Sequence, residues 1–153
     1  MPSVSIVVES KYGNTAKVAE AVAKGLTDSG ISEVVVNGIR EIDAEEVARA
    51  DVILIGSPNH VGGPTRTVKK LIRAISKRDL SRKSVAFFDT YLNKDFGKAV
   101  GKMEAEMASR NPKANLITPG LSLRVTSMKG PLAEGELDKG VEFGRAISVR
   151  TRS

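Results

Sequence analysis

The 153-residue sequence contains no cysteine and a single histidine, His60, and these two features exclude several kinds of site. Without cysteine the chain forms no disulfide, iron–sulfur cluster, thiolate zinc site or catalytic thiol. A lone histidine excludes the paired-histidine metal sites of zinc hydrolases. We therefore predict no metal site, and we assign no catalytic residue.

Long hydrophobic runs and aromatic residues are also scarce. No segment reaches the roughly 18 consecutive apolar residues that a membrane helix needs. The N-terminus lacks the basic and hydrophobic regions of a signal peptide. Aromatic residues make up 4% of the chain and are not interleaved with basic ones, which disfavours stacking on nucleic acid. We expect a cytoplasmic protein that neither inserts into membranes nor binds nucleic acid.

The residues that are present suffice for one core and give an excess of positive charge. Hydrophobic residues make up 41%, and 24 Lys and Arg against 18 Asp and Glu give a formal charge of +6. A chain of this length buries about 70% of the surface that its unfolded form exposes. We predict a single domain over residues 1–148 and a basic tail over residues 149–153.

Short apolar segments alternate with amphipathic helical patterns along the chain. The expected strands cover residues 4–8, 34–36, 52–56, 85–89 and 116–125, the last interrupted at Pro119-Gly120. Strands buried on both faces read as continuous apolar runs, and helical crossovers join parallel strands. We therefore predict an α/β fold with three layers, a doubly wound parallel sheet covered by helices on both faces.

Five helices are expected between and after these strands. Their boundary signals are Gly30 at the end of the first, Asp43 capping the second through Glu46, Pro64 in the first turn of the third, and Asp95 near the start of the fourth. The last helix is expected over residues 134–148, with Leu137, Val141 and Ile147 facing the core.

The segment between the first strand and the first helix is rich in groups that bind phosphate. It offers the hydroxyls of Ser10 and Thr15, the Asn14 amide, a flexible Gly13 and the free N–H groups of a helix N-terminus, and Lys11 adds charge. The sequence has no G-x-x-x-x-G-K-[ST] loop and no G-x-G-x-x-G fingerprint. Residues 10–15 are thus either a phosphate site of another kind or a polar capping loop.

The same six residues, Ser-Lys-Tyr-Gly-Asn-Thr, resemble the phosphate loop of the flavodoxin family, [ST]-x-[TYF]-G-N-T. Residues 52–58 and 87–97 resemble the family's other two flavin-contacting loops. Residues 130–137 resemble the last loop and helix of a bacterial and archaeal flavodoxin-like branch. The resemblance spans nearly the whole chain. It implies a five-stranded sheet in the order 2-1-3-4-5 and a non-covalently bound FMN cofactor.

The resemblance also implies which residues contact the FMN. The phosphate would be held by Ser10, Lys11, Tyr12, Gly13, Asn14 and Thr15. The ribityl chain and one face of the isoalloxazine ring would be bordered by Ser57, Pro58, Asn59, His60, Val61 and Gly62. The other side would be bordered by Asp89, Thr90 and Tyr91, with Tyr91 as the stacking aromatic.

Three of these residues have a second interpretation. His60 either stacks on or hydrogen-bonds to the flavin, or is simply exposed to solvent. Tyr12 either stacks near the phosphate or only shields the loop. Asp89 either contacts a flavin hydroxyl or only ends its strand. The chain also lacks the Trp with which many flavodoxins flank the flavin.

The positive charge departs from the family, whose electron carriers are typically acidic. A unit charge about 10 Å from the flavin, at an effective dielectric constant near 20, contributes roughly 1–2 kcal/mol, or ~60 mV per electron. We therefore expect the anionic reduced flavin to be less disfavoured here. Basic residues concentrate after the third strand, where they dock an acidic redox partner, contact nucleic acid or form a solvated helix face: Lys69, Lys70, Arg73, Lys77, Arg78, Arg82 and Lys83.

Three functions are compatible with this sequence. The first is an FMN-binding carrier that shuttles electrons between protein partners. The second is an FMN-dependent oxidoreductase that acts on a quinone- or porphyrinogen-type acceptor. The third is a flavin-free module that binds a phosphate ligand or a partner. The sequence shows no long insertion to cover a flavin, which favours the carrier over a self-contained enzyme. A monomer and a homodimer both fit.

Overall fold

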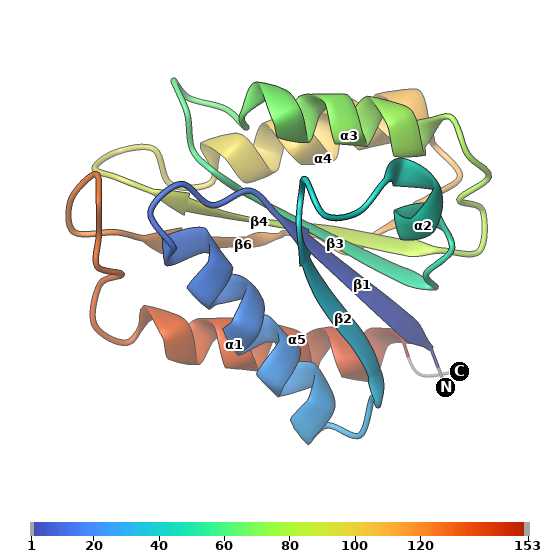
Figure 1. Ribbon diagram of the computed structural model, residues 1–153, viewed down its shortest axis with the longest axis horizontal. Coiled ribbons are helices and arrows are strands. Elements are labelled where there is room, and N and C mark those ends of the chain that lie inside the picture. Colours follow the sequence, from blue (N-terminus) through green and yellow to red (C-terminus); the bar gives the residue numbers. More distant parts are fainter. Residues whose placement is uncertain (1, 152–153) are drawn as a thin grey trace.

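A computed structural model describes residues 2–151 and shows a parallel sheet between two layers of helices (Figure 1). The strands are β1 (Ser3–Val8), β2 (Glu33–Gly38), β3 (Val52–Pro58), β4 (Ser84–Tyr91), β5 (Asn115–Leu116) and β6 (Leu121–Arg124). The helices are α1 (Asn14–Asp28), α2 (Ala44–Ala48), α3 (Arg66–Ser76), α4 (Lys98–Arg110) and α5 (Glu136–Thr151). None of the helices within residues 2–151 is long and apolar enough to cross a lipid bilayer.

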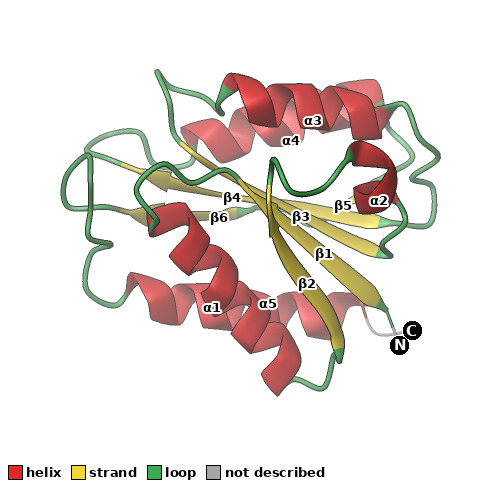
Figure 2. Cartoon of the chain, viewed as in Figure 1, coloured by secondary structure: helices red, strands yellow, loops and turns green. Residues whose placement is uncertain are grey.

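The strand order β2-β1-β3-β4-β5 confirms the predicted doubly wound topology (Figure 2). The expected fifth strand is divided into β5 and β6, which both pair with β4 in parallel. The break falls at Pro119-Gly120, as predicted. Proline has no N–H for the ladder, and Gly120 packs so closely on the Phe87 carbonyl that a Cβ there would collide with it.

The two faces of the sheet carry separate hydrophobic cores, as expected for three layers. Side chains alternate between the faces along a strand, so Phe87 lies in the core under α3 and α4 while Phe88 lies in the core under α1 and α5. Both rings are fully buried. Each contributes about 2–3 kcal/mol through removal of apolar surface from water.

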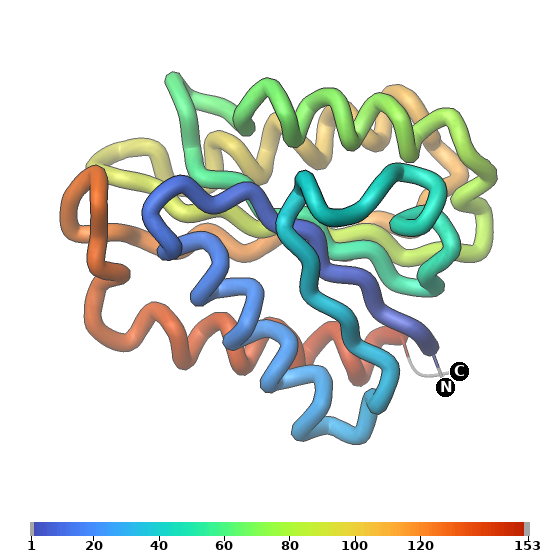
Figure 3. The backbone as a smooth tube through the Cα atoms, in the orientation of Figure 1, coloured from blue at the N-terminus to red at the C-terminus, as the bar shows by residue number. Residues whose placement is uncertain are grey.

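Helices α1 and α5 lie side by side on one face and approach each other through glycines (Figure 3). A Cβ on Gly25 of α1 would collide with the Val141 carbonyl, and one on Gly144 of α5 would collide with the Val22 carbonyl. The expectation that Leu137 faces the core is wrong, because its side chain is 39% exposed. Small residues four positions apart, rather than large apolar ones, make this contact.

The helix boundaries agree with the sequence signals in two cases and differ in three. Gly30 ends α1 with φ 98°, its N–H bonded to the Thr27 carbonyl, and Asp43 caps α2 through the Glu46 N–H at 2.9 Å. The other three bounds differ from expectation. Pro64 precedes the N-cap Thr65 of α3, and Asp95 lies two residues before the N-cap Gly97 of α4. Helix α5 continues to Thr151, through the start of the expected tail; residues 152–153 of that tail lie outside the described part.

Candidate cofactor site

The segments that leave β1, β3 and β4 meet at one end of the sheet, where the strands have their carboxyl ends (Figure 1). Hydrogen bonds join them. The Glu9 N–H donates to the Gly56 carbonyl at 3.1 Å, and the Asn59 N–H donates to the Thr90 carbonyl at 2.8 Å. The hydroxyls of Thr15 and Thr90 lie 2.9 Å apart. The structure thus brings together the three segments predicted from the sequence.

The first segment, residues 10–15, presents a row of free backbone donors. Gly13, the N-cap of α1, takes the left-handed φ of 91°, which glycine adopts without strain. Ser10 Oγ accepts the Ala16 N–H at 3.1 Å, which keeps the turn closed and leaves the hydroxyl proton free. Within the described chain, the N–H groups of residues 11–15 have no acceptor. Together with the helix dipole, these donors suit a phosphate.

The side chain of Asn14 holds a neighbouring loop instead of facing solvent. Its amide donates to the Lys129 carbonyl at 3.1 Å, and Gly130 packs so closely on it that a Cβ would collide. The Lys129 ammonium consequently lies 6.0 Å from the centre of the Tyr12 ring, and the Lys11 ammonium lies 5.5 Å from it. Lys129 was missed from the sequence, although its turn-rich surroundings marked a loop.

The second segment, residues 57–63, forms a tight turn. The Ser57 hydroxyl is fully buried, donating to the Pro58 carbonyl at 2.9 Å and accepting the Thr65 N–H at 3.1 Å. The backbones of His60 and Gly63 exchange two hydrogen bonds, which leaves Val61 and Gly62 at the tip with φ of 50° and 74°. His60 is exposed and Val61 is 90% exposed.

Asn59 carries an unsatisfied acceptor in this turn. Its amide nitrogen donates to Asp95 Oδ2 at 2.8 Å, whereas its Oδ1 is buried and meets no donor among residues 2–151. Asp95 is also bonded to the Lys98 ammonium, which is the main cause that lowers the pKa of this carboxyl below its usual value. A buried oxygen without a donor is unfavourable, and an N–H group at the polar edge of a flavin ring would satisfy it.

The third segment supplies aromatic surface. Tyr91 is half-buried and meets Phe96 edge to face, with ring centres 5.5 Å apart and planes at 84°. Phe96 is 69% exposed. Flat apolar rings of this kind pack well on an aromatic cofactor. Phe96 was not among the predicted site residues, although its position directly before the helix-starting Gly97 was a usable signal.

The side chain of Asp89 forms hydrogen bonds with other parts of the protein. The carboxylate is fully buried and accepts hydrogen bonds from the Ser122 hydroxyl at 2.5 Å and the Val100 N–H at 2.9 Å. Burial raises the pKa of this carboxyl to about 6, although both hydrogen bonds lower it. Asp89 therefore anchors the first turn of α4 to the sheet, and a contact with the cofactor stays a prediction.

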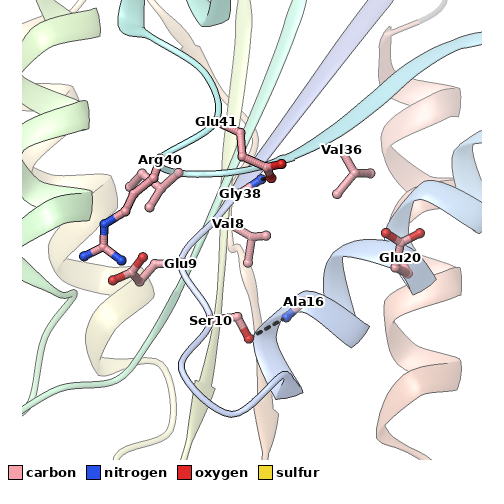
Figure 4. Close-up of a pocket in the computed structure, with 10 residues that line it drawn as sticks. Val8, Glu9, Ser10, Ala16, Glu20, Val36, Gly38, Arg40 and Glu41 are labelled. Atoms are coloured by element: carbon pink, nitrogen blue, oxygen red, sulfur yellow. Dashed lines mark hydrogen bonds between the residues drawn. The ribbon is translucent and has the colours of Figure 1, made fainter.

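A hollow of about 370 Å³ lies on the other side of the first segment, between α1 and the connection from β2 to α2 (Figure 4). Glu9, Glu20 and Glu41 line it beside Arg40. The Glu41 carboxylate accepts the Gly38 N–H at 2.7 Å. Ser10 also lines this hollow, which therefore adjoins the predicted phosphate loop, and its three carboxylates disfavour a phosphate inside it.

Known proteins resemble this chain in sequence. A family model described as a flavodoxin domain matches residues 5–121. A flavodoxin from Aquifex aeolicus (strain VF5) is 28% identical over 109 residues, which cover 71% of this chain and 50% of that protein. A flavodoxin from Clostridium saccharobutylicum is 30% identical over 87 residues, which cover 57% of this chain and 54% of that protein. The chain spans about half the length of the curated relatives it matches.

Solved structures share the fold. A flavodoxin from the domain Archaea superposes with a TM-score of 0.82 at 19% identity over 97% of both chains. Oxidised Flavodoxin 1 from Bacillus cereus superposes with a TM-score of 0.79 at 22% identity over 99% of both chains. The flavodiiron protein from Giardia intestinalis superposes with a TM-score of 0.78 at 20% identity. The match covers 97% of this chain and 36% of that protein's chain.

FMN is the cofactor of flavodoxins. The free N–H groups of residues 11–15 fit its phosphate, and the unpaired oxygen of Asn59 fits the polar edge of its ring. A family model that covers residues 5–121 and a fold shared over almost the whole chain lead to one conclusion: this chain belongs to the flavodoxin family.

Proposed function

We propose that this protein is an FMN-dependent electron carrier that passes electrons between protein partners. The observation that carries the proposal is the row of unpaired N–H donors at residues 11–15, at the same end of the sheet as the Asn59 acceptor and the Tyr91–Phe96 pair. Donors for a phosphate, an acceptor for an N–H and an aromatic surface are the three features that a flavin mononucleotide needs.

The chain's own residues bind and orient the cofactor. The N–H groups of residues 11–15 and the Ser10 hydroxyl proton would hold the phosphate, and the α1 dipole would stabilise its charge. Residues 57–62 and residues 90–91 would border the ring. When bound, FMN supplies the electron-transfer chemistry. The Thr15–Thr90 contact fixes the distance between the phosphate loop and the ring side of the site.

Two features favour a carrier over a self-contained oxidoreductase. The turn at residues 60–63 leaves Val61 exposed, with no segment of residues 2–151 covering it. His60 is also exposed. An open site suits transfer to another protein. With a formal charge of +6, the chain would favour an acidic partner, and we propose that it acts in the cytoplasm.

Reconstitution with FMN tests this proposal. The purified protein should retain FMN on desalting, show absorption bands near ~370 and ~450 nm, and quench FMN fluorescence at a 1:1 ratio. Failure to quench at micromolar concentrations would contradict both redox functions and leave a flavin-free module. Rapid oxidation of NADH or NADPH by the purified flavoprotein alone, with a quinone as acceptor, would instead favour the oxidoreductase.

A further inference from the structure

The positive charge of this chain is concentrated in one layer of the fold. Residues 66–113, which run from the start of α3 to just beyond α4, contain 13 of the 24 Lys and Arg but only 5 of the 18 Asp and Glu. This stretch has a formal charge of +8, and the rest of the chain has −2. Helices α3 and α4 cover one face of the sheet, while α1 and α5 cover the other (Figure 1). One outer surface of the molecule is therefore strongly cationic.

Helix α3 presents only cations to solvent. Its apolar residues are buried against the sheet: Val68, Leu71, Ile72 and Ile75. All four of its exposed residues are Lys or Arg, and the C-capping residue continues the row: Arg66, Lys69, Lys70, Arg73 and Lys77. At about 100° per residue, these five positions fall within an arc of roughly 100°, opposite the apolar side. We name these five residues the basic stripe.

Acidic residues leave most of the basic stripe unpaired. Within residues 2–151 only Arg73 of the stripe forms an ion pair, and its Nε lies 3.5 Å from Glu106 of α4. Glu106 is closer to Arg110, at 2.7 Å, and Glu104, the other acid of α4, accepts a backbone N–H at 2.8 Å. Both carboxylates are half-buried. Among residues 66–113, Asp79 is the only Asp or Glu that is exposed.

The opposite layer has a balanced mixture of charges. Helices α1 and α5 together contain five cations and five acids. Ion pairs join neighbouring side chains there, such as Lys24 with Asp28 at 2.7 Å and Arg145 with Glu142 at 2.9 Å. On α3, in contrast, like charges recur three and four positions apart, which destabilises a helix. An anionic surface placed over the basic stripe would remove this repulsion.

We infer that the basic stripe adsorbs this protein to an anionic lipid surface. Protein interfaces have an apolar centre, and no large hydrophobic side chain of α3 or α4 is exposed. Base stacking needs aromatic side chains, and neither helix contains one. Long, flexible cations without an apolar centre suit lipid headgroups, whose negative charge is spread over a plane. Because the apolar side of α3 is packed on the sheet, the helix would lie on the headgroups without inserting.

Adsorption through the basic stripe would leave the candidate cofactor site open. That site lies at the carboxyl ends of the strands, whereas the stripe runs along the outer side of α3 (Figure 1). The site would therefore open along the membrane surface and not toward it. The inference does not depend on the proposed function. Taken together, the two would place an electron carrier beside redox partners that are embedded in the membrane.

Two triple charge reversals in the full chain test the inference. The stripe variant is Lys69→Glu, Lys70→Glu, Lys77→Glu. The control changes three exposed cations of the opposite layer: Lys17→Glu, Arg145→Glu, Arg150→Glu. Each variant lowers the formal charge from +6 to 0. The stripe variant keeps Arg66 and Arg73, four positions from the new carboxylates, so urea unfolding should show no loss of stability.

The probe is a vesicle of equal parts phosphatidylcholine and phosphatidylglycerol, and a pure phosphatidylcholine vesicle is the neutral reference. Binding is measured by cosedimentation at low ionic strength, with and without FMN. Each cation near an anionic membrane strengthens partitioning about fivefold, so the stripe variant should bind about a hundredfold more weakly than the wild type. The control should lose less than about fivefold, and about 0.5 M salt should abolish binding. The neutral vesicle should bind none of the three proteins.

The orientation on the membrane can be measured with a fluorescent label. Because the chain has no cysteine, Ala105→Cys on α4 and Ala146→Cys on α5 each create a single labelling site, and both positions are exposed. Energy transfer to a lipid labelled on its headgroup should be stronger from α4 than from α5. Equal transfer from the two helices would contradict adsorption through the basic stripe.

Three binding results would also overturn the inference. The first is a wild-type protein that does not bind the anionic vesicle at low salt. The second is an equal loss in both variants, because net charge alone would then explain it. The third is tighter binding of duplex DNA or polyglutamate than of vesicles at equal charge concentration, which would assign the stripe to a nucleic acid or an acidic protein. None of these measurements needs bound FMN, so a failure to retain FMN would contradict only the proposed function.

Discussion

The phosphate loop and the two segments that would border the flavin ring use their polar residues in opposite ways. At residues 11–15 the backbone N–H groups are left free. In the segments expected beside the ring, the side chains of Ser57 and Asp89 are buried and hold the N-terminal ends of α3 and α4 through hydrogen bonds. The free backbone N–H groups would thus serve a ligand, whereas these buried side chains give rigidity.

The pH dependence of stability should show the structural role of Asp89 most strongly. Its pKa is about 6 in the folded protein against 3.8 ordinarily. The folded state therefore holds a proton that the unfolded chain has lost, so this group's contribution is present below about pH 4 and is lost as the pH rises through 6. The difference amounts to about 3 kcal/mol. Asp89→Asn should abolish this slope in urea unfolding between pH 4 and 7.

The matched variant for that experiment is Asp138→Asn, which changes an exposed carboxyl on α5. It should leave the wild-type pH profile in place. If Asp89→Asn retained the full slope, the titrating group would lie elsewhere and the anchoring role of Asp89 would lose its support.

Ser57→Ala should separate stability from cofactor binding. The variant leaves the half-buried N–H of Thr65 without its acceptor, so we expect a loss of about 1–2 kcal/mol in the free energy of unfolding. FMN affinity of the remaining folded protein should change little. Ser109→Ala on the exposed surface of α4 is the control, and it should be within about 0.5 kcal/mol of the wild type. A large loss of FMN affinity with unchanged stability would contradict this prediction, because the Ser57 side chain would then serve the cofactor and not the packing of α3.

Gly13→Ala should lower both the free energy of unfolding and the affinity for FMN. The left-handed φ of 91° is strained for alanine by about 1–2 kcal/mol, and relief of that strain would move the free N–H groups. Unfolding in urea and FMN titration measure the two effects. Gly101→Ala in exposed helical backbone, with nothing within 4 Å of the added Cβ, should instead stabilise by about 0.5–1 kcal/mol. Equal responses of the two variants would argue against a special backbone at Gly13.

Asn59→Ala should give the smallest effect. Removal of the unsatisfied Asn59 oxygen offsets the loss of the hydrogen bond to Asp95. The free energy of unfolding should therefore stay within about 1 kcal/mol of the wild-type value. FMN affinity should fall about tenfold, since the proposed hydrogen bond between Asn59 Oδ1 and the ring could no longer form. Asn115→Ala, at the opposite end of β4, should leave the affinity unchanged. An affinity loss shared by both variants would contradict the role of Asn59.

The local patterns of the sequence predicted the strands and the turns well, and the resemblance to flavodoxins supplied the strand order that the structure confirms. Apolar runs marked the strands, and Gly13 and Gly30 marked turns with left-handed backbone. Side-chain roles were harder to predict. The sequence did not predict that the side chains of Ser57 and Asp89 bond to the first turns of α3 and α4, because the direction of a polar side chain at a strand end depends on the helix termini beside it.

Long-range contacts account for the remaining differences. Leu137 was expected inside because helical spacing was read without its partner helix, whereas Gly140 and Gly144 make the close contact with α1. Lys129 lies 115 residues from Asn14 in the sequence, and their hydrogen bond has no local pattern. The four-residue spacing of glycines in α5 was the one available signal for close helix packing.

The most direct test of the phosphate loop is a calorimetric comparison of FMN with riboflavin, which differ only in the phosphate. Several charge-assisted hydrogen bonds to the N–H groups of residues 11–15 should make FMN bind at least about a hundredfold more tightly, and the difference should persist in Asn59→Ala. Equal affinities for the two ligands would contradict the central claim that the free backbone donors of this loop form a phosphate site.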